Sequence, residues 1–269
     1  MTGTSTGPAA LRWVALGTNG FFPSWGRETM SFLLHRGGRA LLFDAGTGLG
    51  RLVEPELRRW VEDQDRLDLV LTHYHLDHVV GLAYLSGLWN RPVRIFGPEA
   101  PLVDADPVTA LRRLVSPPLF PKPLDELGLD VEIVPYSGTE LTIGSFDLVL
   151  RRQRHPGGSV GVRVDDALAY VTDTEPDPGT VDLCRGARTL LHEVWSTGEE
   201  AAAPDYEARG HSSTTAVAEI ASEAGVGRLV PVHHRPDRDA TAVAAVAAEL
   251  ASLTACPVVL ADEGRAYEA

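Results

Sequence analysis

The sequence predicts an α/β protein with two β-sheets and helices on their outer faces. Short apolar runs that end in turn residues indicate strands, and longer runs with helical spacing indicate helices. Strands come first, then helices, then strands and helices again, which is typical of layered sheets covered by helices. The chain has 269 residues, enough to bury a large core. We treat residues 1–269 as a single domain.

The first group of strands is expected near the amino terminus, at short runs of apolar residues closed by turn residues. The last of these runs leads directly into a helical pattern at 76–88, where apolar residues recur with helical spacing. The strands expected in this group are 11–17, 30–36, 40–46 and 67–73.

A proline-rich segment at 98–130 separates the two halves of the chain. It keeps apolar residues throughout and has one helical pattern at 108–115, so we expect an insertion that covers the surface and not a linker. Two further helices are expected, at 213–224 and 240–252. The second group of strands is expected within 131–136, 139–155, 160–164, 167–173, 189–195 and 228–234.

Composition argues against several classes of protein. The formal charge of −13, from 24 Lys and Arg against 37 Asp and Glu, disfavours binding to nucleic acid. The two cysteines, Cys184 and Cys256, form neither a metal-binding spacing nor a disulfide framework, which fits a cytoplasmic location. No apolar run reaches the roughly 18 residues of a membrane span. The first residues lack the basic and apolar regions of a signal peptide.

The strongest functional signal is the stretch THYHLDH at 72–78. His73 and His75 are two residues apart, so on an extended segment their side chains point the same way. Asp77 and His78 follow where the chain turns into the predicted helix. A solvated polar turn would not concentrate these four residues within six positions. Since imidazole and carboxylate together suit zinc, manganese or iron, the stretch predicts a metal site.

Because the chain changes direction within this stretch, it can present ligands to two nearby points. Four residues cannot complete two metal sites, so further ligands are expected elsewhere in the chain. Histidines and an aspartate at the ends of predicted strands are well placed to meet in a shared cleft. His192, inside a predicted strand, is expected to be structural. The remaining candidates are His155, Asp173, His211, His233 and His234.

These motifs resemble those of the metallo-β-lactamase superfamily. The stretch HYHLDH matches its His-x-His-x-Asp-His motif, and LLFDAGTG, RHPGGSVGVRV, YVTDTE, GHSS and VHH resemble its later motifs in order. The segments LGTNGFFPSWGRETMSFLL, LLHEVW and GHSSTTA look most like ribonuclease Z and its phosphodiesterase-like relatives. The resemblance implies a four-layer αββα sandwich. It also implies a hydrolase with two divalent metal ions, for which we expect Zn²⁺, with Mn²⁺ or Fe as alternatives.

Carried over to this chain, the resemblance implies two ion sites that share one ligand, with a water or hydroxide between the ions. The first site would use His73, His75 and His155, the second Asp77, His78 and His233, and Asp173 would bridge them.

The resemblance also implies catalytic residues. Asp77 would act through the second ion, and Glu193 with His211 would form a dyad that protonates the leaving oxygen. A carboxylate beside an imidazole keeps the imidazole charged and able to donate a proton. The alternative is that His211 only caps a helix that begins near Ser212 or Ser213.

Three more residues have two interpretations each. Asp44 orients the histidine loop, caps a turn, or does both. His234 either contacts the substrate or supports a ligand. Arg235 either meets a substrate phosphate or carboxylate, or faces solvent.

Three classes of function follow. The first is a phosphodiesterase acting on a small molecule or nucleotide. The second is a hydrolase of esters, thioesters or lactones, favoured if the apolar segment 101–124 covers the substrate. The third, a non-catalytic or redox metal protein, is disfavoured because the histidines typical of hydrolases are kept. We do not expect transfer RNA as a partner, because the long Gly/Pro-rich arm of ribonuclease Z is absent from the sequence. The sequence is compatible with a homodimer.

Overall fold

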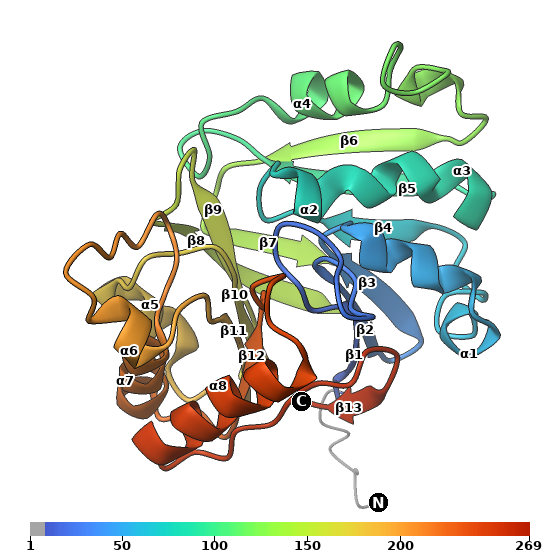
Figure 1. Cartoon of the computed structure of the whole chain (residues 1–269). Coiled ribbons are helices and arrows are strands. Elements are labelled where there is room, and N and C mark those ends of the chain that lie inside the picture. The colour runs from blue at the N-terminus through green and yellow to red at the C-terminus, as the bar shows by residue number, and fades with distance from the viewer. Residues whose placement is uncertain (1–8) are drawn as a thin grey trace, which may run out of the picture.

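The computed structural model describes residues 9–269 and contains two β-sheets packed face to face, with helices on the outer side of each (Figure 1). The strand order is β13-β1-β2-β3-β4-β5-β6 in the seven-stranded sheet and β12-β11-β10-β9-β8-β7 in the six-stranded sheet. The predicted four-layer αββα sandwich is therefore confirmed.

The first sheet takes most of its strands from the first half of the chain, and β3 to β6 run parallel to one another. Its strands are β1 (Arg12–Gly17), β2 (Ser31–Arg36), β3 (Arg39–Phe43), β4 (Leu67–Val70), β5 (Val93–Pro98), β6 (Val131–Tyr136) and β13 (Ala266–Glu268). The helices of this half are η1 (Thr47–Val53), α1 (Pro55–Arg58), α2 (Leu76–Val79), η2 (Val80–Tyr84), α3 (Leu85–Leu88), α4 (Pro107–Leu114) and η3 (Leu124–Glu126).

The second sheet combines antiparallel strands with a parallel set, β10, β11 and β12. Its strands are β7 (Glu140–Ile143), β8 (Phe146–Gln153), β9 (Ser159–Val164), β10 (Leu168–Val171), β11 (Thr189–Glu193) and β12 (Leu229–Val232). The helices of this half are α5 (Pro178–Cys184), α6 (Gly198–Ala201), α7 (Thr214–Ala224) and α8 (Ala240–Leu253).

Apolar side chains fill three layers between these elements. Along β1, Trp13 faces the layer between the sheets and Val14 faces the helices of the first sheet, because successive side chains of a strand point to opposite faces. A third layer joins the second sheet to its helices through residues such as Val217 and Leu250. Each fully buried side chain of this kind contributes about 1.5–3 kcal/mol to folding. Together the layers hold the strand ends that carry the polar residues.

The assignment of 131–136 to the second group of strands was wrong. This segment, β6, pairs in parallel with β5 in the first sheet. The neighbour β5 was not predicted, because Val93–Pro98 is short, contains Arg94 and ends in proline. Parallel neighbours are joined by a crossover, here through α4, so they are far apart in sequence.

The predicted helix at 76–88 is three short segments, α2, η2 and α3. Peptide groups of these segments form hydrogen bonds with the loop after β3. The Ala45 N–H donates to the His78 carbonyl oxygen and the Gly81 N–H donates to the Ala45 carbonyl oxygen, each at 2.7 Å. A Cβ at Gly81 would lie 2.2 Å from the Gly46 carbonyl oxygen, so only glycine permits this approach. The contact brings the Asp44 loop under the histidines.

Short elements were not predicted either, namely η1, α1, η3, α5, α6 and β13, although α5 follows a visible start signal, Asp177 before Pro178. None of the described helices is long and apolar enough to cross a membrane. The expected absence of a signal peptide concerns in part residues 1–8, which lie outside the described residues.

Candidate active site

The candidate site lies where strands of both sheets end. The predicted strands 67–73, 167–173 and 228–234 stop at residues 70, 171 and 232, which leaves their polar residues in loops just beyond the strands. The carboxyl ends of parallel strands commonly form ligand sites in α/β folds, because side chains from several strands converge there.

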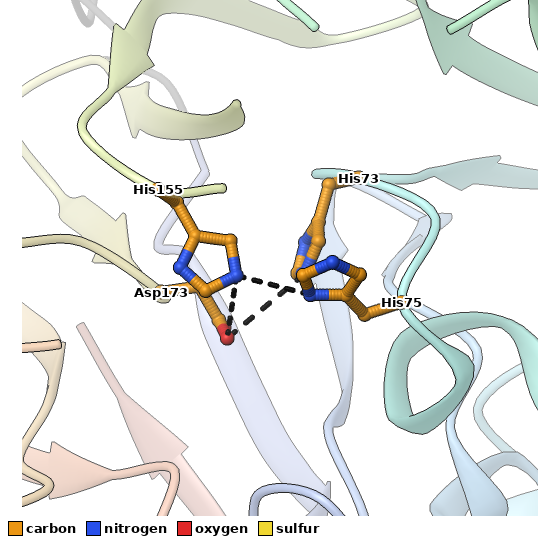
Figure 2. A group of neighbouring side chains, drawn as sticks. All are labelled: His73, His75, His155 and Asp173. Carbon is orange, nitrogen blue, oxygen red and sulfur yellow. Dashed lines mark hydrogen bonds and ion pairs between the residues drawn. The ribbon is translucent and has the colours of Figure 1, made fainter. Parts of the chain in front are cut away.

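Figure 2 shows one group, His73, His75, His155 and Asp173, whose side chains point toward one another. One ligand-type atom from each residue lies within 4.8 Å of the others. The His155 Nε2 atom is 3.0 Å from His75 Nδ1, and Asp173 Oδ1 is 3.7 Å from His155 Nε2. The structure therefore brings together the residues that were predicted to share the first ion.

A second group consists of Asp77, His78 and His233. Asp77 Oδ2 is 3.2 Å from His233 Nε2 and 3.5 Å from His78 Nε2. Asp173 also reaches this group, with Oδ2 at 3.1 Å from His78 Nε2 and Oδ1 at 3.2 Å from His233 Nε2. Asp173 thus contacts both groups, as a bridging ligand must.

The histidine nitrogens that face these groups fit a metal ion. In the described part of the chain, Nε2 of His73 and Nε2 of His78 are buried and have no well-aligned hydrogen-bond partner, although the Asp173 carboxylate lies 3.1 Å from His78 Nε2. Leaving a buried polar atom without a partner costs about 1–3 kcal/mol. The opposite nitrogens are held by other residues, His73 Nδ1 at 3.1 Å from Thr72 Oγ1 and His78 Nδ1 at 2.9 Å from Asp44 Oδ2. Each ring therefore keeps a free nitrogen for a divalent ion.

The protonation states of His73 and Asp173 suit metal binding. Burial, together with the neighbouring His78, lowers the pKa of His73 well below its ordinary value, so the ring is neutral. Burial by itself would raise the pKa of Asp173, but His233 and His78 hold it well below its usual range. Neutral imidazole and ionised carboxylate are the forms that coordinate metals. Burial by itself would lower the pKa of His78, but the carboxylates of Asp173, Asp77 and Asp44 raise it well above its ordinary value, so a bound metal ion would have to displace this proton.

Asp44 is fully buried beneath the two groups. Besides His78, its carboxylate accepts hydrogen bonds from the Thr72 N–H at 2.7 Å and from the Tyr170 hydroxyl at 2.8 Å. Its backbone lies in the left-handed region, with φ at 55°. Both interpretations of Asp44 therefore have contacts to support them, because the carboxylate fixes the turn and also holds the His78 ring.

We expect Asp44→Asn to weaken binding of the second ion by about 10–100-fold, the usual cost of losing a group that orients a metal ligand. The amide would present a donor or a weaker acceptor to His78 Nδ1. Competition with a metal chelator measures this affinity. Tyr170→Phe is the matched control, since it removes one hydrogen bond to Asp44 and leaves the His78 contact in place. Equal losses in the two variants would contradict an orienting role.

Glu193 and His211 lie beside the two groups. His211 Nδ1 is 3.2 Å from Glu193 Oε1, which also accepts a hydrogen bond from the Thr174 N–H at 2.7 Å. Burial by itself would lower the pKa of His211, but the Glu193 carboxylate raises it to about 9. His211 is therefore charged at neutral pH and lines the cavity over the site.

The alternative in which His211 caps a helix is wrong. The side chain that caps α7 is Ser213, which accepts a hydrogen bond from the Ala216 N–H. His211 also forms a group with Asp173 and His233 whose ligand-type atoms lie within 4.8 Å of one another. A proton donor and a further metal ligand are thus the two roles compatible with its position.

His234 and Arg235 do not line the cavity. Burial, with Arg27 and Arg238 nearby, lowers the pKa of His234 to about 3. The peptide group of His234 holds a neighbouring loop instead, accepting from the Gly20 N–H at 3.0 Å. Arg235 pairs with Glu200 at 2.9 Å and with Asp237.

The position of Arg235 therefore does not support contact with a substrate phosphate. His192 is buried, with Nδ1 2.7 Å from the Glu193 carbonyl oxygen, which agrees with the structural role expected for it.

A cavity of about 570 Å³ opens over the site. Besides histidines and aspartates, it is lined by five residues that were not predicted from the sequence. Only the tertiary structure shows that these residues belong to the site. For example, the Trp195 ring stacks on His211 at 4.6 Å between centroids. The five are Phe21, Leu76, Pro156, Trp195 and Arg209.

The condition that would favour an ester, thioester or lactone hydrolase, a substrate covered by segment 101–124, has no support here, because no described residue of 98–130 lines this cavity. Part of the segment packs on the outer face of the first sheet through Leu111, Val115 and Leu124. Its beginning supports the loop that carries His155, since the Asp104 N–H donates to the Gly157 carbonyl oxygen at 2.8 Å.

Comparison with known proteins gives consistent matches. The family model of the Beta-lactamase superfamily domain matches residues 39–234. The chain is 30% identical over 250 residues to a protein named Ribonuclease Z from Mycobacterium sp. (strain KMS), covering 82% of this chain and 83% of the relative. It is 26% identical over 245 residues to Ribonuclease Z from Methanopyrus kandleri, covering 81% of this chain and 85% of the relative. The structure of the metallo-beta-lactamase fold protein YhfI from Bacillus subtilis superposes with a TM-score of 0.76 at 20% identity, covering 98% of this chain and 100% of that one.

Proposed function

We propose that this chain, which belongs to the metallo-β-lactamase superfamily in its ribonuclease Z branch and is a metal-dependent hydrolase, cleaves a phosphodiester bond in a small molecule or nucleotide. The observation that carries the proposal is the Glu193–His211 pair, 3.2 Å apart, beside two ligand groups that share Asp173. A charged imidazole at this position can donate a proton to an alkoxide leaving group. An activated leaving group, in a phosphodiester or in an acyl ester, needs such a donor less.

Two divalent ions, with zinc as our proposal, would complete the site. When bound, such ions lower the pKa of a water molecule and neutralise the charge of phosphate oxygens. The first would be held by His73, His75 and His155, the second by Asp77, His78 and His233, and Asp173 would be shared.

The chain's own residues orient this set. The Phe21 N–H donates to Asp77 Oδ2 at 2.6 Å, and the Asp44 carboxylate holds His78. His211 would hold the proton that the leaving oxygen takes. Arg209 lines the cavity, and its Glu207 partner, 3.0 Å away, is exposed, so the guanidinium is available for a phosphate oxygen.

A side-by-side assay tests the proposal. The purified protein, loaded with zinc or manganese, should cleave bis(p-nitrophenyl) phosphate, and removal of the metal with a chelator should stop the reaction. A p-nitrophenyl acyl ester should be a much poorer substrate in the same preparation. Good turnover of acyl esters with no cleavage of the phosphodiester would refute the proposal and assign the chain to the ester, thioester or lactone hydrolases.

Transfer RNA is the second candidate substrate, favoured by the relatives named Ribonuclease Z. The charge of −13 and the absence of a long Gly/Pro-rich arm from the sequence argue against it. We therefore expect weak binding of transfer RNA precursors, measured by fluorescence anisotropy at low and physiological salt. A tight complex whose affinity falls by about 10³–10⁵-fold between roughly 50 and 200 mM salt would contradict this expectation.

We also propose a cytoplasmic location, supported by two cysteines that remain free thiols, Cys184 and Cys256. A homodimer stays a prediction.

A further inference from the structure

Apolar side chains gather at the mouth of the cavity, although they face water. Phe21 is 69% exposed and Leu76 is 61% exposed, and both line the cavity together with Pro156 and Trp195. Exposed apolar side chains that cluster beside polar residues commonly mark a binding surface. Here they adjoin the proposed metal ligands, because Leu76 lies between His75 and Asp77 in the chain.

Phe21 is held in a fixed position by its backbone. Its φ is 65°, in the left-handed region that aromatic residues rarely adopt. Its N–H donates to Asp77 Oδ2 at 2.6 Å, so the ring stands beside a proposed metal ligand. Such a backbone conformation persists where surrounding contacts enforce it, and it is often found at functional sites.

The contacts that enforce it come from the rest of the β1–β2 loop, residues 18–30. At its beginning, the Thr18 N–H donates to Glu263 Oε1 at 2.9 Å, and near its end the Glu28 N–H donates to the same carboxylate at 3.2 Å. Gly20 packs against the His233 ring, where an added Cβ would lie 2.3 Å from Cε1. The loop is therefore tied to the C-terminal segment and to the site, which fixes the backbone from which the Phe21 ring projects.

The cavity has room for more than a phosphate group. Its volume of about 570 Å³ lies in the range of pockets for small organic ligands. Its lining combines imidazole and carboxylate groups with two exposed apolar side chains, Phe21 and Leu76. A matching ligand has an anionic end that enters first and a flat apolar group that stays at the mouth.

We propose that the substrate carries an aromatic ring, from a nucleobase or an aryl ester, that lies against Phe21 while its phosphodiester reaches the proposed metal ligands. This inference rests on the proposed phosphodiesterase function and names its substrate class. Aromatic rings stack on each other or meet edge to face, and such pairs stabilise complexes beyond simple burial. Phe21 would thus be a specificity-determining residue.

Binding of non-hydrolysable anions to the zinc-loaded protein tests the inference without requiring turnover. Isothermal titration calorimetry should give a Kd for phenylphosphonate about tenfold lower than for methylphosphonate, as expected for one ring contact. Phe21→Ala should reduce this ratio to about twofold or less, mainly by weakening phenylphosphonate. Phe21→Tyr, which keeps a ring, should retain the ratio. All three forms keep the backbone N–H that donates to Asp77.

Phe22→Ala is the matched control. Phe22 is 48% exposed in the same loop, and its ring lies 5.3 Å from that of Phe21, but it does not line the cavity. It should leave the ratio unchanged. A parallel titration with uridine 5′-monophosphate separates the two sources of the ring, since a Phe21-dependent gain for the nucleotide alone would assign a nucleobase and a gain for phenylphosphonate alone would assign an aryl group.

Several results would overturn the inference. Equal Kd values for phenyl- and methylphosphonate in the wild-type protein would remove the ring site and leave the phosphodiesterase proposal intact. Failure of every anion to bind would contradict both the ring site and the phosphodiesterase proposal. A change of molecular mass in light scattering after Phe21→Ala would assign the side chain to a subunit contact and not to the substrate.

Discussion

Replacing Asp173 with alanine should remove both proposed metal ions and lower phosphodiester turnover by at least about 10³-fold. Bound metal ions supply several kcal/mol of transition-state stabilisation, and each 1.36 kcal/mol corresponds to a factor of ten. The effect should exceed that of other ligand changes because Asp173 contacts both groups, at 3.1 Å from His78 and 3.7 Å from His155. Plasma mass spectrometry of the purified variant measures the metal content.

Single-site variants make this test specific. His73→Ala should release mainly the first ion, because His73 belongs to the group with His75 and His155. Asp182→Ala removes a carboxylate that is exposed and pairs with Arg185, and it should change neither metal content nor turnover. Circular dichroism checks that each variant is folded. If Asp173→Ala kept two ions per chain, the proposed bridging role would be untenable.

Replacing His211 with alanine should cost far more on an alkyl phosphodiester than on a p-nitrophenyl phosphodiester. General acid catalysis contributes about 10²–10⁴-fold, and a leaving group of low pKa needs little of it. The expected loss is therefore in this range for the alkyl ester and small for the aryl ester. The ratio of kcat/KM values for the two substrates measures it.

The His211 variant also separates a proton donor from a metal ligand. Unchanged metal content with a large loss on the alkyl ester supports the donor role, whereas loss of an ion would assign His211 to the group with Asp173 and His233. Equal small losses on both esters would count against either role. Ser213→Ala is the structural control, because it removes the α7 cap and leaves the imidazole.

Glu193→Gln should weaken the donor in a pH-dependent way. Burial lowers the pKa of His211 and the Glu193 carboxylate raises it to about 9, so removing this charge should lower the pKa again. Because the donor works only when protonated, activity on the alkyl ester should decline at lower pH than in the wild-type protein. Activity on the p-nitrophenyl ester should change much less.

The sequence was sufficient for the features that depend on near neighbours. The HYHLDH stretch places four ligand-type residues within six positions, and a strand before it makes them converge. Helices α7 and α8 were predicted closely, because helical spacing and capping residues such as Ser213 and Asp239 are local signals. Most strands of both sheets were predicted for the same reason, since alternation and turn residues are read over a few positions.

Only the tertiary structure decided which distant segments meet. It placed β6 beside β5, and it put the Phe21 N–H on Asp77, 56 residues away in the chain. It also paired Arg235 with Glu200 outside the cavity. The physical reason is that such contacts depend on how whole layers pack, so their energy is shared among residues with no common local pattern. The sequence could therefore indicate candidate ligands, which the structure brings together, whereas the walls that would select a substrate were determined by packing.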